Sequence, residues 1–177
     1  KMREYLEAMD SQPFAGRKPA EQVPVVLAAL GPKMLELSST NADGAHPYWT
    51  TPEHTAMARD TIGPDALLCV EQKVCLSTDA DAARQAGIAQ ISAYAELPNY
   101  RNNWLRLGFT DDQIEQRDPA FVDAVFVWGD EDRVRAGVQA HYDAGATHVC
   151  IQPVMAGDAP RGALDRTVVE LLAPANA

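Results

Sequence analysis

The sequence predicts an α/β protein in which parallel strands alternate with helices. Short apolar runs lack the polar alternation of a half-exposed strand, as expected of strands that are covered on both faces. Each run leads into a turn residue and then into a stretch with helical periodicity or a helix cap. No repeat, low-complexity tract or linker divides the chain, so we expect a single domain over residues 1–177.

Four apolar runs are the expected strands. They are rich in valine, leucine or isoleucine and are bounded by glycine, proline or aspartate. They cover residues 24–30, 42–48, 67–76 and 147–154. Strands that alternate with helices form parallel pairs with right-handed crossovers, so we expect one helix followed by four strand–helix units.

The helices begin and end at specific signals. Pro32 suits a first helical turn because proline lacks the amide hydrogen that would be unpaired there. Capping boxes are expected at residues 50–53 and 110–113, and Gly145 ends a helix as its C′ residue. The expected helices cover residues 1–10, 50–61, 78–95, 129–145 and 164–172, with a short helix from residue 32, helical pieces in 98–117 and a loop at 12–22.

Two architectures fit this order of elements. An open doubly wound sheet suits the length of 177 residues. The other is half of a (β/α)8 barrel, since a whole barrel takes about 250 residues. Residues 120–127 are apolar and fit a helix or a strand, and the pattern alone leaves both architectures open.

Composition excludes several classes of function. The net charge of −10 would repel nucleic acid phosphates and anionic membranes, so neither is an expected partner. No apolar run approaches the roughly 18 residues of a membrane span, and the first residues do not form the apolar h-region expected of a signal peptide. Cys69, Cys75 and Cys150 form no CxxC pair and lie in apolar stretches, so we expect buried reduced thiols and no metal site. These features favour a soluble, cytoplasmic protein.

The stretch VLAALGPKMLEL at residues 26–37 joins the first strand to a helix. Ligands of parallel α/β proteins bind at the C-terminal ends of the strands, where a helix that follows directly presents unpaired N–H groups and the positive end of its dipole. Ala28, Ala29 and Gly31 have little side chain to keep a ligand from the backbone, and Lys33 adds a positive charge. The stretch fits a phosphate cradle or a tight turn that only requires glycine and proline.

Three segments of the chain resemble one known family. VVLAALGPKMLELSS at residues 25–39, ADGAHPYWTTPEHT at 42–55 and FVWGDEDRVRAGVQAHYDAGATHVCIQPV at 126–154 are similar, in this order, to the second half of bacterial luciferase-like monooxygenases. The branch that uses the deazaflavin coenzyme F420 resembles them most. The resemblance covers residues 2–154 and implies a (β/α)8 TIM barrel with an insertion, of which this chain holds strands five to eight.

The resemblance also implies where a cofactor binds. Family members hold the phosphate-bearing tail of a flavin or deazaflavin after strand five and near the end of strand six. Coenzyme F420 is the expected cofactor and FMN the alternative. The implied cofactor-binding residues are Ala28, Ala29, Leu30, Gly31, Pro32, Lys33, Gly44, Ala45 and His46.

The implied activity is that of an oxidoreductase or monooxygenase acting on a small organic substrate. A reduced deazaflavin carries a hydride and a reduced flavin can activate oxygen, while the protein positions the ring. In the family, strands one to four hold most groups that contact the ring. We therefore expect a longer natural protein, homo-oligomeric in its full-length form, and do not expect these 177 residues to catalyse a reaction alone. The alternative is a non-catalytic half-barrel that binds a phosphorylated ligand or serves as an assembly module.

The remaining candidates have weaker support. His46 either faces the pocket beside Tyr48 and Trp49 or is a loop histidine bonded to backbone, whereas His54 is expected to be solvated. Residues 99–109 fit a substrate lid, a capping helix or a subunit contact. Further candidates without an assigned catalytic role are the pocket-wall residue Gln152, the flanking His141 and His148, and the acidic helix start at 129–132.

Overall fold

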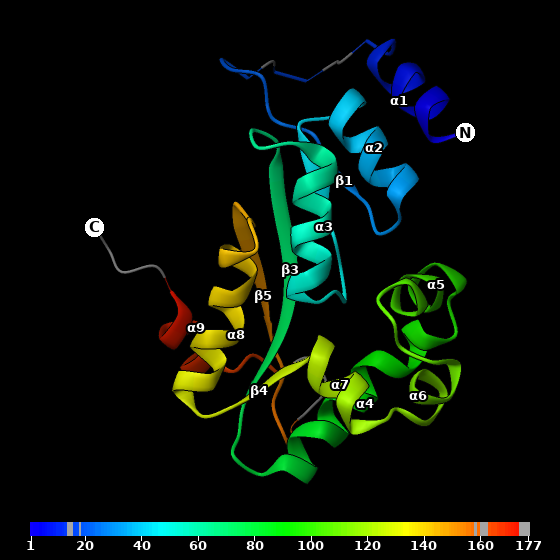
Figure 1. The fold of residues 1–177 in the computed structure, drawn as a ribbon. Helices are drawn as coiled ribbons and strands as arrows, with labels where there is room; N and C mark the ends of the chain where they lie inside the picture. Colours follow the sequence, from blue (N-terminus) through cyan, green and yellow to red (C-terminus); the bar gives the residue numbers. More distant parts are fainter. Residues whose placement is uncertain (14–15, 18, 158, 160–162, 174–177) are drawn as a thin grey trace.

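The computed structural model describes residues 1–13, 16–17, 19–157, 159 and 163–173, and Figure 1 shows their arrangement. The expected loop at 12–22 therefore lies partly outside the described residues. The strands are β1 (Val26–Ala28), β2 (Gly44–His46), β3 (Leu67–Leu76), β4 (Val127–Gly129) and β5 (His148–Pro153). The helices are α1 (Met2–Asp10), α2 (Pro32–Asn41), α3 (Pro52–Ile62), α4 (Ala80–Ala95), α5 (Pro98–Arg106), α6 (Asp111–Gln116), α7 (Pro119–Val125), α8 (Glu131–Asp143) and α9 (Arg166–Leu172).

The sheet is parallel and is organised around β3. β2 pairs with the start of β3 and with β1, and β5 pairs with residues 69–74 of β3. The amide of Leu67 donates to a carbonyl group next to β2, and the amide of Ser77 donates to a carbonyl group of β4. Leu68 and Val74 instead form hydrogen bonds with the residues that flank β5. Because alternate residues of a parallel strand bond to opposite edges, β2 and β4 share one edge of β3 and β5 occupies the other.

Helices cover one face of this sheet. Leu68 and Val70 of β3 pack with Leu35 of α2 and with α3, and Val74 of β3 packs with α8 and α9. Figure 1 shows α4 to α7 grouped instead beyond the C-terminal end of β3. A doubly wound sheet would have helices on both faces. The strand order β1-β2-β3-β5 with helices outside is therefore half of a (β/α)8 barrel, which confirms the parallel α/β prediction and decides between the two architectures.

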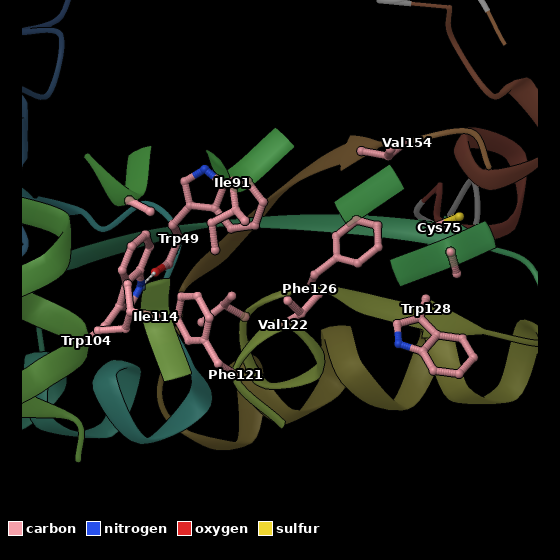
Figure 2. Close-up of a cluster of buried hydrophobic side chains, with 13 residues drawn as sticks. Trp49, Cys75, Ile91, Trp104, Ile114, Phe121, Val122, Phe126, Trp128 and Val154 are labelled. Atoms are coloured by element: carbon pink, nitrogen blue, oxygen red, sulfur yellow. Dashed lines mark hydrogen bonds between the residues drawn. The ribbon is translucent and has the colours of Figure 1, made fainter. Parts of the chain in front are cut away.

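A hydrophobic cluster joins the helices of the C-terminal end. Ile91 of α4, Trp104 of α5, Ile114 of α6 and Phe121 of α7 meet there around Trp49, as Figure 2 shows. The additional members, also buried, are Cys75, Ala83, Ala95, Val122, Val125, Phe126, Trp128 and Val154. This cluster fixes the position of α5 relative to the ends of β1 and β2.

Local signals were predicted with uneven success. The capping box at Thr110 and Gln113 and the C′ role of Gly145, whose φ is +100°, are confirmed. The capping box at residues 50–53 is wrong by one position, because Thr51 is the N-cap and accepts from the amide of His54. The ambiguous segment 120–127 holds the end of α7 and the start of β4, a strand that the sequence did not predict.

A buried histidine ties α8 to β3 and α3. His141 is fully buried, and its two ring nitrogens lie 2.7 Å from Gln72 Oε1 and 2.8 Å from Thr55 Oγ1. An amide oxygen only accepts, so Nε2 carries the proton and Nδ1 accepts from the threonine. Burial lowers the pKa of His141 to about 4, although the charge of Glu53 opposes the shift.

Stability should consequently depend on pH below neutrality. The unfolded chain protonates His141 near its ordinary pKa of 6.5, while the folded chain resists protonation down to about 4. The free energy of unfolding should therefore fall by roughly 1.4 kcal/mol per unit as pH decreases through this window. Urea unfolding of wild type and His141→Gln between pH 7 and 4 checks this: the substitution should flatten the dependence, and the exposed His148→Gln should not. An equal slope in wild type and His141→Gln would contradict the prediction.

Candidate functional site

A cavity of about 290 Å³ lies at the C-terminal ends of β1 and β2. The loop after β1 forms one wall, and α5 forms the opposite wall with its polar residues Asn99, Asn102 and Arg106 and with Tyr100. Of the nine residues that the family resemblance implied, those that line the cavity are Ala28, Ala29, Leu30, Gly31 and His46. The cavity thus occupies the edge of the sheet at which parallel α/β proteins bind ligands.

The other four implied residues do not line this cavity. Pro32 and Lys33 form the first turn of α2, next to the cavity wall. Ala45 is fully buried toward the helices, in the cluster with Leu35. A Cβ on Gly44 would lie 2.0 Å from the carbonyl oxygen of Leu67, so this glycine permits close approach of two strands.

The start of α2 is electrostatically unusual within this acidic chain. Gly31 is its N-cap, no side chain caps it, and no acidic residue stands in its first turn. α5, whose first turn also contributes to the cavity, likewise begins with proline and without a side-chain cap. Side chains cap α3, α4, α6, α7, α8 and α9, and α1, which contributes no residue to this cavity, is also uncapped. No lining residue of the cavity is acidic, and Arg106 is cationic, so the site favours an anion.

His54 stabilises the loop after β1. The prediction that it is solvated is wrong, because the side chain is fully buried and Nε2 lies 2.8 Å from the carbonyl oxygen of Leu30. The carbonyl can only accept, so His54 donates from Nε2 and holds the loop against α3. Burial lowers its pKa despite this hydrogen bond, and the charge of Arg106 lowers it further, so the ring is neutral near pH 7.

His46 shares one feature with each of its two predicted alternatives, although it is the last residue of β2 and not a loop residue. It lines the cavity, and its Nδ1 lies 2.6 Å from the backbone oxygen of Cys69. Since the carbonyl accepts, Nδ1 donates, and this bond fixes the ring at the end of β2.

A buried ion pair lies beside the cavity on the face of β3 turned away from the helices. Glu71 and Lys73 are 2% and 3% exposed, and Lys73 Nζ lies 2.8 Å from Glu71 Oε1. Residues two apart on a strand share a face, so both side chains project toward what would be the barrel interior. Burial lowers the pKa of Lys73, whereas the charge of Glu71 and the hydrogen bond to it raise the pKa.

Aromatic rings enclose this ion pair. Lys73 Nζ lies 4.1 Å from the ring centroid of Tyr48 and 4.3 Å from that of Trp49, distances at which cation–π attraction operates. The rings of Tyr94 and Tyr100 extend this group of aromatic side chains toward α5, and their centroids lie 5.0 Å apart. Burial chiefly raises the pKa of Tyr100 to about 12, so this cavity-lining phenol is neutral over the physiological range.

Sequence reasoning missed this group of residues. The run LLCVEQKVCL at residues 67–76 was taken as an apolar strand, although it contains glutamate, glutamine and lysine in succession. Charged residues are almost never fully buried unless they are paired. A glutamate and a lysine two apart inside a strand covered on both faces were therefore the available signal for the ion pair of Glu71 and Lys73.

The remaining candidates from the sequence, all in the described part of the chain, do not form a metal site. The three cysteines are free; Cys75 is buried as expected, while Cys69 and Cys150 are only half-buried. Among the residues that the structure describes, no group of three histidine, cysteine or acidic side chains could hold a metal ion. None of the described helices is long and apolar enough to cross a membrane. Residues 99–109 form mainly α5, the wall of the cavity.

The ion pair of Glu71 and Lys73 leads to a prediction about the stability of single and double variants. Lys73→Met should lower the free energy of unfolding by about 3–5 kcal/mol, because it leaves the Glu71 carboxylate buried without its partner. The double variant Glu71→Gln with Lys73→Met should lose less, since the glutamine oxygen can still accept from the amide of Trp49, 3.1 Å from Glu71 Oε2.

Urea unfolding at pH 7 measures these differences. Arg101→Met is the matched control, because it breaks the exposed pair with Asp111 and should cost no more than about 1 kcal/mol. If the double variant were less stable than Lys73→Met, the ion-pair explanation would be wrong.

Three solved structures share the fold at low sequence identity. An F420-dependent secondary alcohol dehydrogenase in complex with an F420–acetone adduct is 14% identical, with a TM-score of 0.55, over 78% of this chain and 45% of that chain. The coenzyme F420-dependent tetrahydromethanopterin reductase from Methanopyrus kandleri is 19% identical, with a TM-score of 0.62, over 85% and 49%. Apo-MsnO8 is 21% identical, with a TM-score of 0.51, over 86% and 52%. The chain spans about half the length of each.

Sequence comparison identifies the family directly. No curated protein matches the chain. The luciferase-like monooxygenase family matches residues 3–148, from α1 to the first residue of β5. The match includes the loop after β1, the end of β2 and all of α5, which together form the cavity. The chain belongs to the luciferase-like monooxygenase family.

Proposed function

We propose that this chain provides the part of an oxidoreductase site that binds the phosphate-bearing tail of coenzyme F420, with FMN as the alternative cofactor. The observation that carries the proposal is the cavity at the uncapped start of α2, which has Arg106 and no acidic residue in its lining. Backbone N–H groups at a helix start and a guanidinium group are the common ligands of phosphate in proteins.

The residues present fit such a group. The loop backbone at Gly31 and the guanidinium group of Arg106 stand next to each other, since a Cβ on Gly31 would lie 3.2 Å from a guanidinium nitrogen. Ala28 and Ala29 keep the adjacent wall shallow. Lys33 projects from the first turn of α2, where it would oppose the helix dipole unless an anion is bound.

Each part of the chain has a defined task in this proposal. Gly31 and the start of α2 bind the anionic tail, Arg106 neutralises its charge from α5, and His54 keeps the loop in place through Leu30. When bound, the deazaflavin supplies a two-electron hydride carrier, and a flavin would also supply oxygen chemistry. The substrate would be a small organic molecule.

A complete site needs a second half of the barrel. β1 and β5 form the outer strands of the described half, and the structures that it matches are about twice as long. Two of those structures are of enzymes described as F420-dependent, which favours F420 over FMN. We propose that four further strand–helix units complete the barrel and the ring site. A homo-oligomer remains a prediction for the complete protein.

The test compares ligands with and without the phosphate-bearing tail. Binding of F420, FMN, riboflavin and the deazaflavin riboside is followed by fluorescence, for this chain alone and joined to four N-terminal strand–helix units. F420 should bind more tightly than the riboside that lacks the tail. Arg106→Gln should weaken F420 binding about tenfold and leave the riboside unaffected, because it removes one charge-assisted contact.

Arg101→Gln is the matched control on the same helix, since Arg101 pairs with Asp111 away from the cavity. Arg106→Gln binding F420 as tightly as wild type would contradict the tail site. Binding of simple phosphate esters without any preference for a deazaflavin or flavin would favour the non-catalytic half-barrel instead.

A further inference from the structure

The hydroxyl group of Tyr48 is held by three hydrogen bonds at the border of the cavity. Lys73 Nζ donates to it at 2.7 Å, and the hydroxyl of Tyr94 donates at 3.5 Å. Tyr48 itself donates to Gln152 Oε1 at 2.9 Å, and Gln152 is exposed. One side of the hydroxyl is therefore held by the buried Lys73, while its single proton points toward Gln152, a solvent-accessible partner at the border of the cavity, outside its lining, that can be exchanged.

The hydroxyl of Tyr48 accepts firmly from one side only. Lys73 donates to it at 2.7 Å, and the hydroxyl of Tyr94 at 3.5 Å adds a weak contact. A tyrosine hydroxyl has one proton to donate, and here it is directed at Gln152, so a ligand that replaces Gln152 receives a hydrogen bond. A protonated amine has no lone pair to receive this hydrogen bond, so it is disfavoured at this point.

The backbone beside Tyr48 is held in an unusual conformation. Trp49 has φ = +56°, a left-handed conformation that is uncommon for a bulky residue and costs about 1–3 kcal/mol. Its amide donates to Glu71 Oε2 at 3.1 Å, and its carbonyl accepts from Trp104 Nε1 at 2.9 Å. Glu71 thus holds Lys73 with one oxygen and the Trp49 backbone with the other, which positions Tyr48 from two directions.

The walls near Tyr48 suit a small and largely apolar molecule. Tyr100, Met34 and His46 line the cavity with Tyr48, and the ring centroid of His46 lies 6.5 Å from that of Tyr48. The cavity volume of about 290 Å³ leaves room for a small molecule beside the loop. The anion-favouring part near Arg106 and this aromatic part are two ends of one space.

We propose that Tyr48 is a substrate-binding residue that donates its hydrogen bond to an acceptor oxygen, so that this part of the cavity selects small carbonyl compounds over equally shaped hydrocarbons and over amines. Lys73 and Glu71 are positioning residues that direct the hydroxyl. This names the substrate class of the site in the proposed function and rests on it, but the hydrogen bond is testable without the cofactor.

The experiment uses cyclohexanone as the probe and methylenecyclohexane, of the same shape, as its hydrocarbon counterpart. Affinities come from quenching of tryptophan fluorescence, and the carbonyl stretching frequency of the bound ketone comes from infrared difference spectra. Relative to the hydrocarbon, wild type should bind the ketone about five- to tenfold more tightly than Tyr48→Phe does, as expected for one hydrogen bond, and it should lower the stretching frequency of the bound ketone. Cyclohexylammonium should bind more weakly than either.

Four variants locate the donor. Tyr48→Phe should abolish both the preference for the ketone and the frequency shift, while Tyr5→Phe on the exposed face of α1 should change neither. Gln152→Leu should retain both, which excludes the glutamine amide as the donor. Lys73→Met, if it folds, should reduce the frequency shift although Tyr48 is still present; a purely structural lysine would leave the shift unchanged.

The outcomes separate this inference from the proposed function. No binding of the ketone, a ratio of ketone to hydrocarbon affinity that Tyr48→Phe leaves unchanged, or a frequency shift that survives Tyr48→Phe would overturn it. Ketone selection that depends on Tyr48, together with no binding of F420 or FMN, would support the carbonyl site and reject the cofactor. F420 binding that depends on Arg106, without ketone selection, would support the cofactor and reject the carbonyl site.

Discussion

The rest of the structure depends on the division of β3 into two faces of different chemistry. Leu68, Val70 and Val74 face the helices and join α2, α3, α8 and α9 to the sheet. Glu71 and Lys73 face the opposite way and are neutralised by each other. Because side chains alternate along a strand, a shift of one residue in the pairing of β3 would place these charges among the apolar helices. The pairing register and the position of the polar site are therefore set together.

The same division explains what the sequence could predict. The limits of β3, the capping box at Thr110 and the C′ position of Gly145 depend on neighbouring residues, and local sequence predicted them. The loop after β1 was also predicted, because small residues before a proline at a helix start are a local pattern. The parallel α/β arrangement follows from the order of such elements, whereas the choice between an open sheet and a half-barrel does not.

The missed features depend on contacts between residues far apart in the chain. β4 has only three residues and exists because it pairs with the end of β3. His54 was expected in solvent, but it is buried because Leu30, 24 residues earlier, offers it a carbonyl group. Tyr48 and Lys73 are 25 residues apart, and only the neighbouring strand positions bring them together. Local periodicity contains no information about such partners.

The two ends of the cavity are preorganised by different means, and this difference has a consequence for ligand binding. At the loop end, the backbone groups at the start of α2 and the exposed Arg106 can bind an anion. Much of the binding free energy there would come from neutralising charge. At the aromatic end, Glu71 holds both Lys73 and the left-handed backbone of Trp49, so the hydroxyl of Tyr48 is fixed before a ligand arrives. A group held in place loses little entropy on binding, so its hydrogen bond contributes to affinity as well as to selectivity. In the proposed site, charge would hold the anionic tail of a cofactor, and the fixed hydroxyl of Tyr48 would discriminate among the small molecules beside it.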